Sequence, residues 1–88
     1  MDKKKKLIWA YHSLVRQNLD NDYYFYEDGT ILHHYDRTIT KWDIEEYVLP
    51  SNISDSDKKK ILSKCESECS IEIVERIKNL LNQKSIQQ

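Results

Sequence analysis

The chain contains a single glycine, Gly29, which follows Asp28 between two segments rich in aromatic and β-branched residues. An Asp-Gly pair in this setting favours a two-residue type I′ turn. The sequence therefore predicts a β-hairpin over residues 22–36. Because this turn uses the one glycine, the sequence offers no glycine-rich loop that could hold a phosphate or an oxyanion.

A two-residue turn also sets the predicted pairing of the two strands, with Tyr26 opposite Ile31 and Phe25 opposite Leu32. Successive side chains of a strand alternate between its two faces. The face assigned to the core carries Tyr23, Phe25, Leu32 and His34, and the other face carries Tyr24, Tyr26, Ile31, His33 and Tyr35. A slip of one residue in the pairing would exchange the faces.

Apolar spacing and capping residues predict three helices. Residues 3–19 have apolar side chains at helical spacing, and Asp20 and Asn21 would end that helix. Ser54 with Asp57 resembles a capping box, which predicts a helix to about residue 64. Ser70 is predicted to cap a last helix that ends at about residue 83, with an apolar stripe like that of residues 3–19.

The segment after the hairpin is less clearly patterned. Residues 38–42 suit a third strand, and residues 43–49 suit either a short helix or a continued strand that ends before Pro50. The sequence as a whole predicts one α+β domain over residues 1–88. It would consist of an N-terminal helix, a small antiparallel sheet and two C-terminal helices on one side of that sheet.

Composition predicts a soluble, cytoplasmic protein. The longest apolar run, Leu7 to Ala10, is four residues long, and a membrane-spanning helix needs about 20. The lysine-rich start lacks the apolar region of a signal peptide. The abundant lysine, isoleucine, tyrosine and asparagine have A/T-rich codons, which indicates an AT-rich genome such as that of a low-GC bacterium or its phage.

Neither metal binding nor catalysis is indicated by the spacing of the reactive residues. Cys65 and Cys69 form a CxxxC pair without the usual zinc-finger spacing, and His33-His34 has no fixed relation to it. Cys65 shares the apolar side of its predicted helix with Ile61, which favours a buried thiol. We therefore expect no metal, no cofactor and no enzymatic activity.

Charge is distributed unevenly along the chain. Residues 17–50 contain eight acidic and two basic residues, although the whole chain has a net charge of −1. Most of the aromatic residues lie in the same segment. Aromatic side chains supply contact area at low entropic cost, and surrounding carboxylates steer a protein toward a basic surface. The candidate partner-binding residues are Tyr24, Tyr26, Tyr35 and Trp42, with Asp22, Asp28 and Asp36 as steering charges.

These features favour a non-enzymatic module that binds a basic surface of a larger protein that handles nucleic acids, such as a nuclease. An immunity protein or a phage inhibitor of the anti-CRISPR type would have such a composition. Trp9 with Arg16 is a second candidate patch. The alternative is a small nucleic-acid-binding regulator that uses Lys3 to Lys6 and Lys58 to Lys60, although the aromatic segment is acidic.

Overall fold

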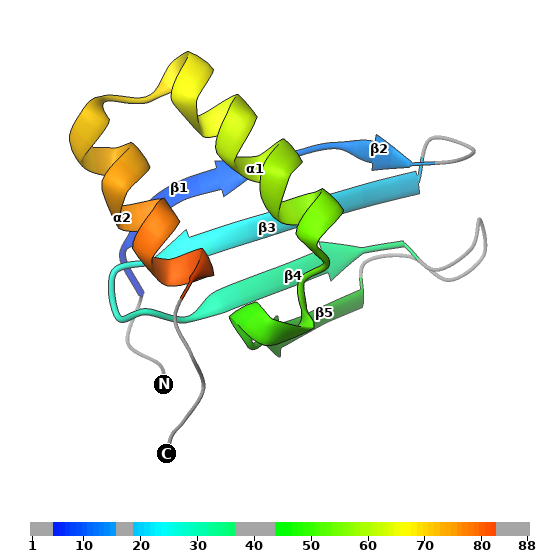
Figure 1. Ribbon diagram of the computed structural model, residues 1–88. Coiled ribbons are helices and arrows are strands. Elements are labelled where there is room, and N and C mark those ends of the chain that lie inside the picture. Colours follow the sequence, from blue (N-terminus) through cyan, green and yellow to red (C-terminus); the bar gives the residue numbers. More distant parts are fainter. Residues whose placement is uncertain (1–4, 16–18, 37–43, 83–88) are drawn as a thin grey trace. The chain divides into compact units, whose positions relative to one another are not determined.

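The computed structural model describes residues 5–15, 19–36 and 44–82, and it has strands followed by helices (Figure 1). The chain divides into two compact units, Met1–Tyr47 and Val48–Gln88. An antiparallel sheet and two α-helices confirm the predicted α+β class. The single domain and the packing of the helices on one side of the sheet stay predictions.

The sheet is organised around its longest strand, β3 (Leu19–Tyr26). The strand order is β1-β3-β4-β5, with β1 at Leu7–Tyr11, β4 at Ile31–Tyr35 and β5 at Ile44–Val48. A short strand, β2 (Leu14–Val15), pairs with the first residues of β3 (Figure 1). Strand β3 is thus paired along both of its edges.

The predicted N-terminal helix over residues 3–19 is wrong, because this segment forms β1 and β2 in the described residues. Strand β1 pairs antiparallel with β3, and Tyr11 lies opposite Tyr23. The register shifts between Leu7 and Trp9, which lie opposite Tyr26 and Phe25. Apolar aromatic and β-branched residues suit a strand as well as an amphipathic helix, and pairing with a distant segment decides between the two.

The predicted hairpin is present, but its predicted register is wrong by one residue. The N–H of Tyr26 donates to the carbonyl of Thr30 at 3.0 Å, so that the loop has three residues. Gly29 ends this loop with a φ of 92°, and its N–H donates to the carbonyl of Tyr26. A three-residue loop of this kind needs positive φ at one residue, whereas a type I′ turn needs it at two.

The corrected register places Phe25 opposite Ile31, Tyr24 opposite Leu32 and Asp22 opposite His34. Relative to the prediction, the side chains of β4 therefore change faces. We call the first face the stacked face; it carries Trp9, Tyr11, Tyr23, Phe25, Ile31, His33 and Tyr35. We call the second face the acidic face; it carries Asp20, Asp22, Tyr24, Tyr26, Leu32 and His34.

The stacked face is the more buried of the two. Phe25 and Ile31 are almost fully buried, and Tyr11 and Tyr23 are also in the core. The Phe25 ring stacks on Trp9, with centroids 6.0 Å apart. Across the sheet, rings stack from Tyr23 to His33 and from His33 to Tyr35, each pair at 4.4 Å.

The open choice for residues 43–49 is resolved in favour of a strand, since β5 covers Ile44–Val48. Pro50 begins a 3₁₀ helix, η2 (Pro50–Asn52), rather than simply ending the strand. The third strand expected over residues 38–42 lies outside the described residues.

Both C-terminal helices form as predicted from their caps. Helix α1 (Asp55–Glu68) begins after Ser54, whose hydroxyl accepts from the Asp57 N–H at 3.1 Å. Helix α2 (Ile71–Leu81) begins after Ser70, whose hydroxyl accepts from the Ile73 N–H at 3.4 Å. Helix α1 is longer than predicted and α2 slightly shorter.

The second unit has a buried set of small and branched side chains from both helices and the segment before them. They are Ile53, Ile61, Cys65, Val74, Ile77 and Leu81. Helix α2 contacts both α1 and η2. No helix among the described residues is long and apolar enough to cross a membrane.

Candidate functional site

The acidic face combines tyrosines with carboxylates, as the sequence predicts for a partner-binding surface. Tyr24 and Tyr26 come from β3 and are half-buried. Burial raises the pKa of Tyr24, and the nearby charge of Asp22 raises it further. The pKa of Tyr26 is also raised by burial, with added contributions from Tyr47 and Glu45. Carboxylates therefore lie near both tyrosines, and the ammonium group of Lys5 partly offsets their effect at Tyr26.

Strand β5 extends this surface beyond the hairpin. Tyr47 is 58% exposed, and its ring lies under the ammonium group of Lys5, whose Nζ is 4.7 Å from the ring centroid. The same Nζ lies 6.0 Å from the centroid of Tyr26. Lys5 thus brings the tyrosines of β3 and β5 into one aromatic group, and Glu45 lies close enough to raise the pKa of both Tyr24 and Tyr26.

Asp28 shapes the hairpin loop at the end of this surface. Its carboxylate accepts from the backbone N–H of Thr30 at 3.0 Å and from the Thr30 hydroxyl at 2.6 Å. The ammonium group of Lys5 donates to the second oxygen at 2.9 Å. These hydrogen bonds lower the pKa of Asp28 to about 2. Asp28 therefore stabilises the loop. Because its carboxylate is bound by Thr30 and by the ammonium group of Lys5, little of its negative charge is left to steer a partner.

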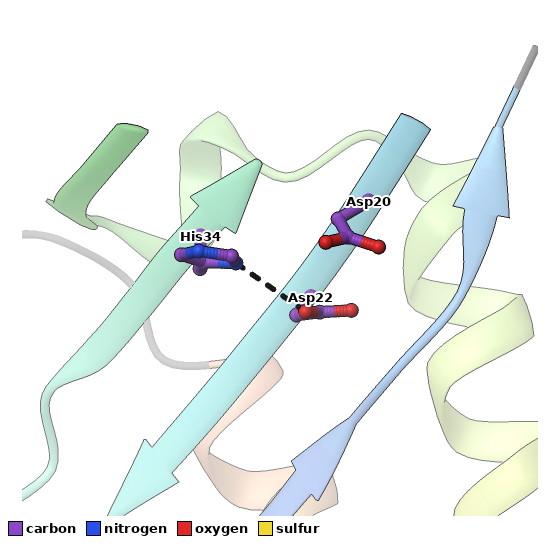
Figure 2. Close-up of side chains that lie close together, drawn as sticks. All are labelled: Asp20, Asp22 and His34. Atoms are coloured by element: carbon purple, nitrogen blue, oxygen red, sulfur yellow. Dashed lines mark hydrogen bonds and ion pairs between the residues drawn. The ribbon is translucent and has the colours of Figure 1, made fainter. Parts of the chain in front are cut away.

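Two carboxylates and an imidazole converge at the other end of the acidic face. Figure 2 shows Asp20 and Asp22 on β3 and His34 on β4. One possible metal-ligating atom from each residue lies within 4.8 Å of the other two. Strand geometry explains the arrangement, because Asp20 and Asp22 are two residues apart and Asp22 lies directly opposite His34.

Asp22 is the buried member of this cluster, with a side chain that is 10% exposed. Its Oδ2 lies 3.4 Å from Nδ1 of His34, and its Oδ1 lies 3.4 Å from Nδ1 of His12. Oδ1 also accepts from the backbone N–H of Ser13 at 3.3 Å. Among the described residues, the neighbours of this buried carboxylate are thus imidazoles and a backbone amide, with no lysine or arginine.

The other predicted site residues lie in different places. Tyr35 is on the stacked face, where it stacks on His33 and donates its hydroxyl proton to Glu46 at 3.2 Å. It is therefore not brought together with Tyr24 and Tyr26. Asp36 accepts from the backbone N–H of Asp20 at 3.0 Å, next to the carboxylate cluster.

The second predicted patch is only partly described. Trp9 is half-buried and belongs to the stacked face, since it lies on a strand rather than on the polar side of a helix. Arg16 and Trp42 lie outside the described residues.

The candidate residues predicted from the sequence do not include Tyr47 of the aromatic group, nor Asp20, His34 and His12 of the carboxylate cluster, although Tyr47 and Asp20 belong to the acidic, aromatic segment. Asp20 and Asp22 have the strand spacing of two, but the helical spacing of residues 3–19 predicts that Asp20 ends a helix. The two-residue turn predicted for Asp28-Gly29 places His34 on the face opposite Asp22, whereas the observed register pairs the two residues. The strand pairing brings Asp20 and His34 into the cluster, and it joins segments that no local sequence signal connects.

The two cysteines are as the sequence predicts. Both are free thiols, and Cys65 is fully buried. Burial raises the pKa of Cys65 to about 12, with a further contribution from its hydrogen bond to Cys69. A thiol with so high a pKa is a poor nucleophile and a poor metal ligand at neutral pH.

Comparisons with protein-family models, with curated proteins and with solved structures each found no match. The fold and the site define the class directly: an α+β protein whose antiparallel sheet has one stacked aromatic face and one acidic, tyrosine-bearing face.

Proposed function

We propose that the protein is a non-enzymatic binding module that covers a basic surface of a larger protein with the acidic face of its sheet. The observation that carries this proposal is the grouping of Tyr24, Tyr26 and Tyr47 beside carboxylates on one face. The three rings are accessible to different degrees, from half-buried to 58% exposed for Tyr47. Tyrosines with this exposure can contact a partner without leaving the folded sheet.

The partner is defined by charge. Asp20, Asp22, Asp36 and Glu45 lie on or beside this face, and the ammonium group of Lys5 donates to Asp28. A negative face attracts a positive one and speeds their association at low salt. Basic surfaces are typical of proteins that contact nucleic acids. The proposed partner is therefore a nuclease or another nucleic-acid-handling protein, and the proposed role is that of a bacterial or phage inhibitor, of the immunity or anti-CRISPR type, in the cytoplasm.

The test begins with affinity capture by the wild-type chain and by the double variant Tyr24→Ala/Tyr26→Ala, followed by binding measurements with each purified candidate. A true anchor should lose about 2 kcal/mol of binding free energy on truncation, or about 30-fold in Kd. Glu45→Gln should mainly slow association and reduce its dependence on salt. The fold of each variant is checked by its thermal midpoint.

The matched control is Tyr35→Ala, which truncates a tyrosine on the stacked face. Its partner affinity should remain within about threefold of the wild type, because only contact residues contribute strongly to binding. Equal capture by the wild type and the double variant would contradict the proposal. Tight, sequence-selective nucleic-acid binding that is lost on replacing Lys3 to Lys6 would show instead that the protein is a nucleic-acid-binding regulator.

A further inference from the structure

We propose that Asp20, Asp22 and His34 bind one divalent transition-metal ion, with Zn²⁺ as the representative ion. The three residues lie on one face of two directly paired strands, so their backbone positions are held by the sheet (Figure 2). The site uses none of the tyrosines of the proposed partner surface, although it includes Asp20 and Asp22 of the acidic face, and its test measures Zn²⁺ uptake alone.

The distances suit a single ion. Metal–ligand bonds of about 2.0–2.2 Å in tetrahedral geometry place neighbouring donor atoms about 3.4 Å apart. Oδ2 of Asp22 and Nδ1 of His34 are separated by 3.4 Å. All three donor atoms lie within 4.8 Å of one another. The half-buried Asp20 side chain can close the remaining distance of roughly 1.4 Å by rotation about its own bonds.

The charge of Asp22 supplies an independent argument. A carboxylate whose side chain is nine-tenths buried needs a compensating positive charge or strong hydrogen bonds. Its described contacts are all 3.3–3.4 Å long, which is weak for a charged acceptor. Asp20 adds a second carboxylate, and among the described residues neither carboxylate forms an ion pair with lysine or arginine. A divalent cation would neutralise both.

The local sequence also runs against strand propensity at this point. Asp20, Asn21 and Asp22 follow one another inside β3, although aspartate and asparagine are depleted in strands. Breaks of a local rule of this kind are expected where a site needs particular side chains. A metal ion would recover the stability that these residues cost the strand.

The donor set determines the class of ion. An imidazole nitrogen with two carboxylates suits Zn²⁺ and its first-row neighbours, whereas Mg²⁺ and Ca²⁺ prefer an all-oxygen set. His12 lies near the second oxygen of Asp22, at 3.4 Å. In the proposed site it is a positioning residue that holds the Asp22 carboxylate, as outer partners commonly do for metal ligands.

The experiment uses the untagged full chain, freed of metal with a chelator and dialysed, and titrates it with Zn²⁺ alone in a calorimeter. We expect one ion per chain and much weaker binding of Mg²⁺ and Ca²⁺. Asp20→Asn and His34→Gln should each weaken Zn²⁺ binding by at least about 100-fold, since loss of an outer partner alone costs 10–100-fold. His12→Gln should weaken it by about tenfold.

Two controls separate this site from others. His33→Gln changes the neighbouring histidine of β4, on the stacked face, and should leave Zn²⁺ affinity unchanged. The double variant Cys65→Ser/Cys69→Ser should also leave it unchanged. Because Asp22 is buried and its variant could unfold, the test rests on Asp20→Asn and His34→Gln, with circular dichroism to verify their fold.

The proposal is overturned if the wild type takes up no Zn²⁺, or if Asp20→Asn and His34→Gln bind it as tightly as the wild type. Loss of binding in the cysteine variant, or Ca²⁺ and Mg²⁺ binding as tight as that of Zn²⁺, would also overturn it. Zn²⁺-dependent shifts of the His34 side-chain NMR signals, absent for His33, would support it.

Discussion

The two faces of the sheet are built from the same strands but differ in what their side chains do. On the stacked face, Phe25 and Ile31 are almost fully buried, and rings contact one another from Trp9 across to Tyr35. On the acidic face, the half-buried Tyr24 alternates with the buried carboxylate of Asp22. The stacked face therefore contributes mainly to stability, whereas the acidic face presents the charged and polar groups on which both proposals depend.

This difference depends on one residue of register. Neighbouring side chains on a strand point to opposite faces, so Ile31 and Leu32 are adjacent in sequence and lie on different faces. The three-residue loop that ends at Gly29 sets which of them joins Phe25. A single loop residue thus decides which histidine meets Asp22 and which tyrosines share a surface.

The largest effect is expected from Phe25→Ala, which removes a fully buried ring and its stacking contact with Trp9. The free energy of unfolding should fall by about 3–5 kcal/mol. Tyr26→Ala, one residue along the strand, should cost about 1 kcal/mol because that side chain is half-buried. Urea denaturation of both variants measures the contrast, and equal losses would contradict the division into two faces.

Ile31→Ala and Leu32→Ala form the sharper pair, because they test the register itself. Ile31 is 1% exposed, so its truncation to alanine should lower the free energy of unfolding by about 2–5 kcal/mol. Leu32 is half-buried on the acidic face and should cost about 1 kcal/mol. Thermal or urea unfolding of the two variants gives the comparison directly. A larger loss of unfolding free energy for Leu32→Ala than for Ile31→Ala would instead support the two-residue turn, in which Leu32 lies on the face of Phe25.

The smallest effect concerns acid stability at the loop that sets the register. The pKa of Asp28 is lowered from 3.8 to about 2 in the folded chain, so its ionised form stabilises the fold above about pH 4. This contribution is lost as the pH falls from about 4 to about 2. Urea midpoints measured across that range should fall less steeply for Asp28→Asn than for the wild type.

Thr30→Val is the matched variant, since it removes the hydroxyl that donates to Asp28 and keeps the backbone N–H. The fall of its urea midpoint between about pH 4 and about pH 2 should lie between those of the wild type and Asp28→Asn. Identical pH profiles for all three proteins would show that these hydrogen bonds do not contribute to the stability of the loop.

The parts of the fold that depend on neighbouring residues could be predicted from the sequence. The side chains of Ser54 and Ser70 each cap a helix by accepting from a backbone N–H three residues later, and the Asp28-Gly29 pair marks a hairpin. The apolar positions Ile61 and Ile77 follow from helical spacing and are buried. In each case the signal and the structure lie within a few residues of one another, where capping and turn chemistry act.

The sequence by itself determined the α+β class, the two capped helices, the hairpin and the concentration of acidic and aromatic residues in its centre. Only the tertiary structure decided that the N-terminal segment is a strand, that Tyr24 and Tyr35 lie on different faces, and that His34 meets Asp22. The physical reason is that strand pairing joins residues far apart in the chain, and a change of one residue in its register moves every side chain of a strand to the other face.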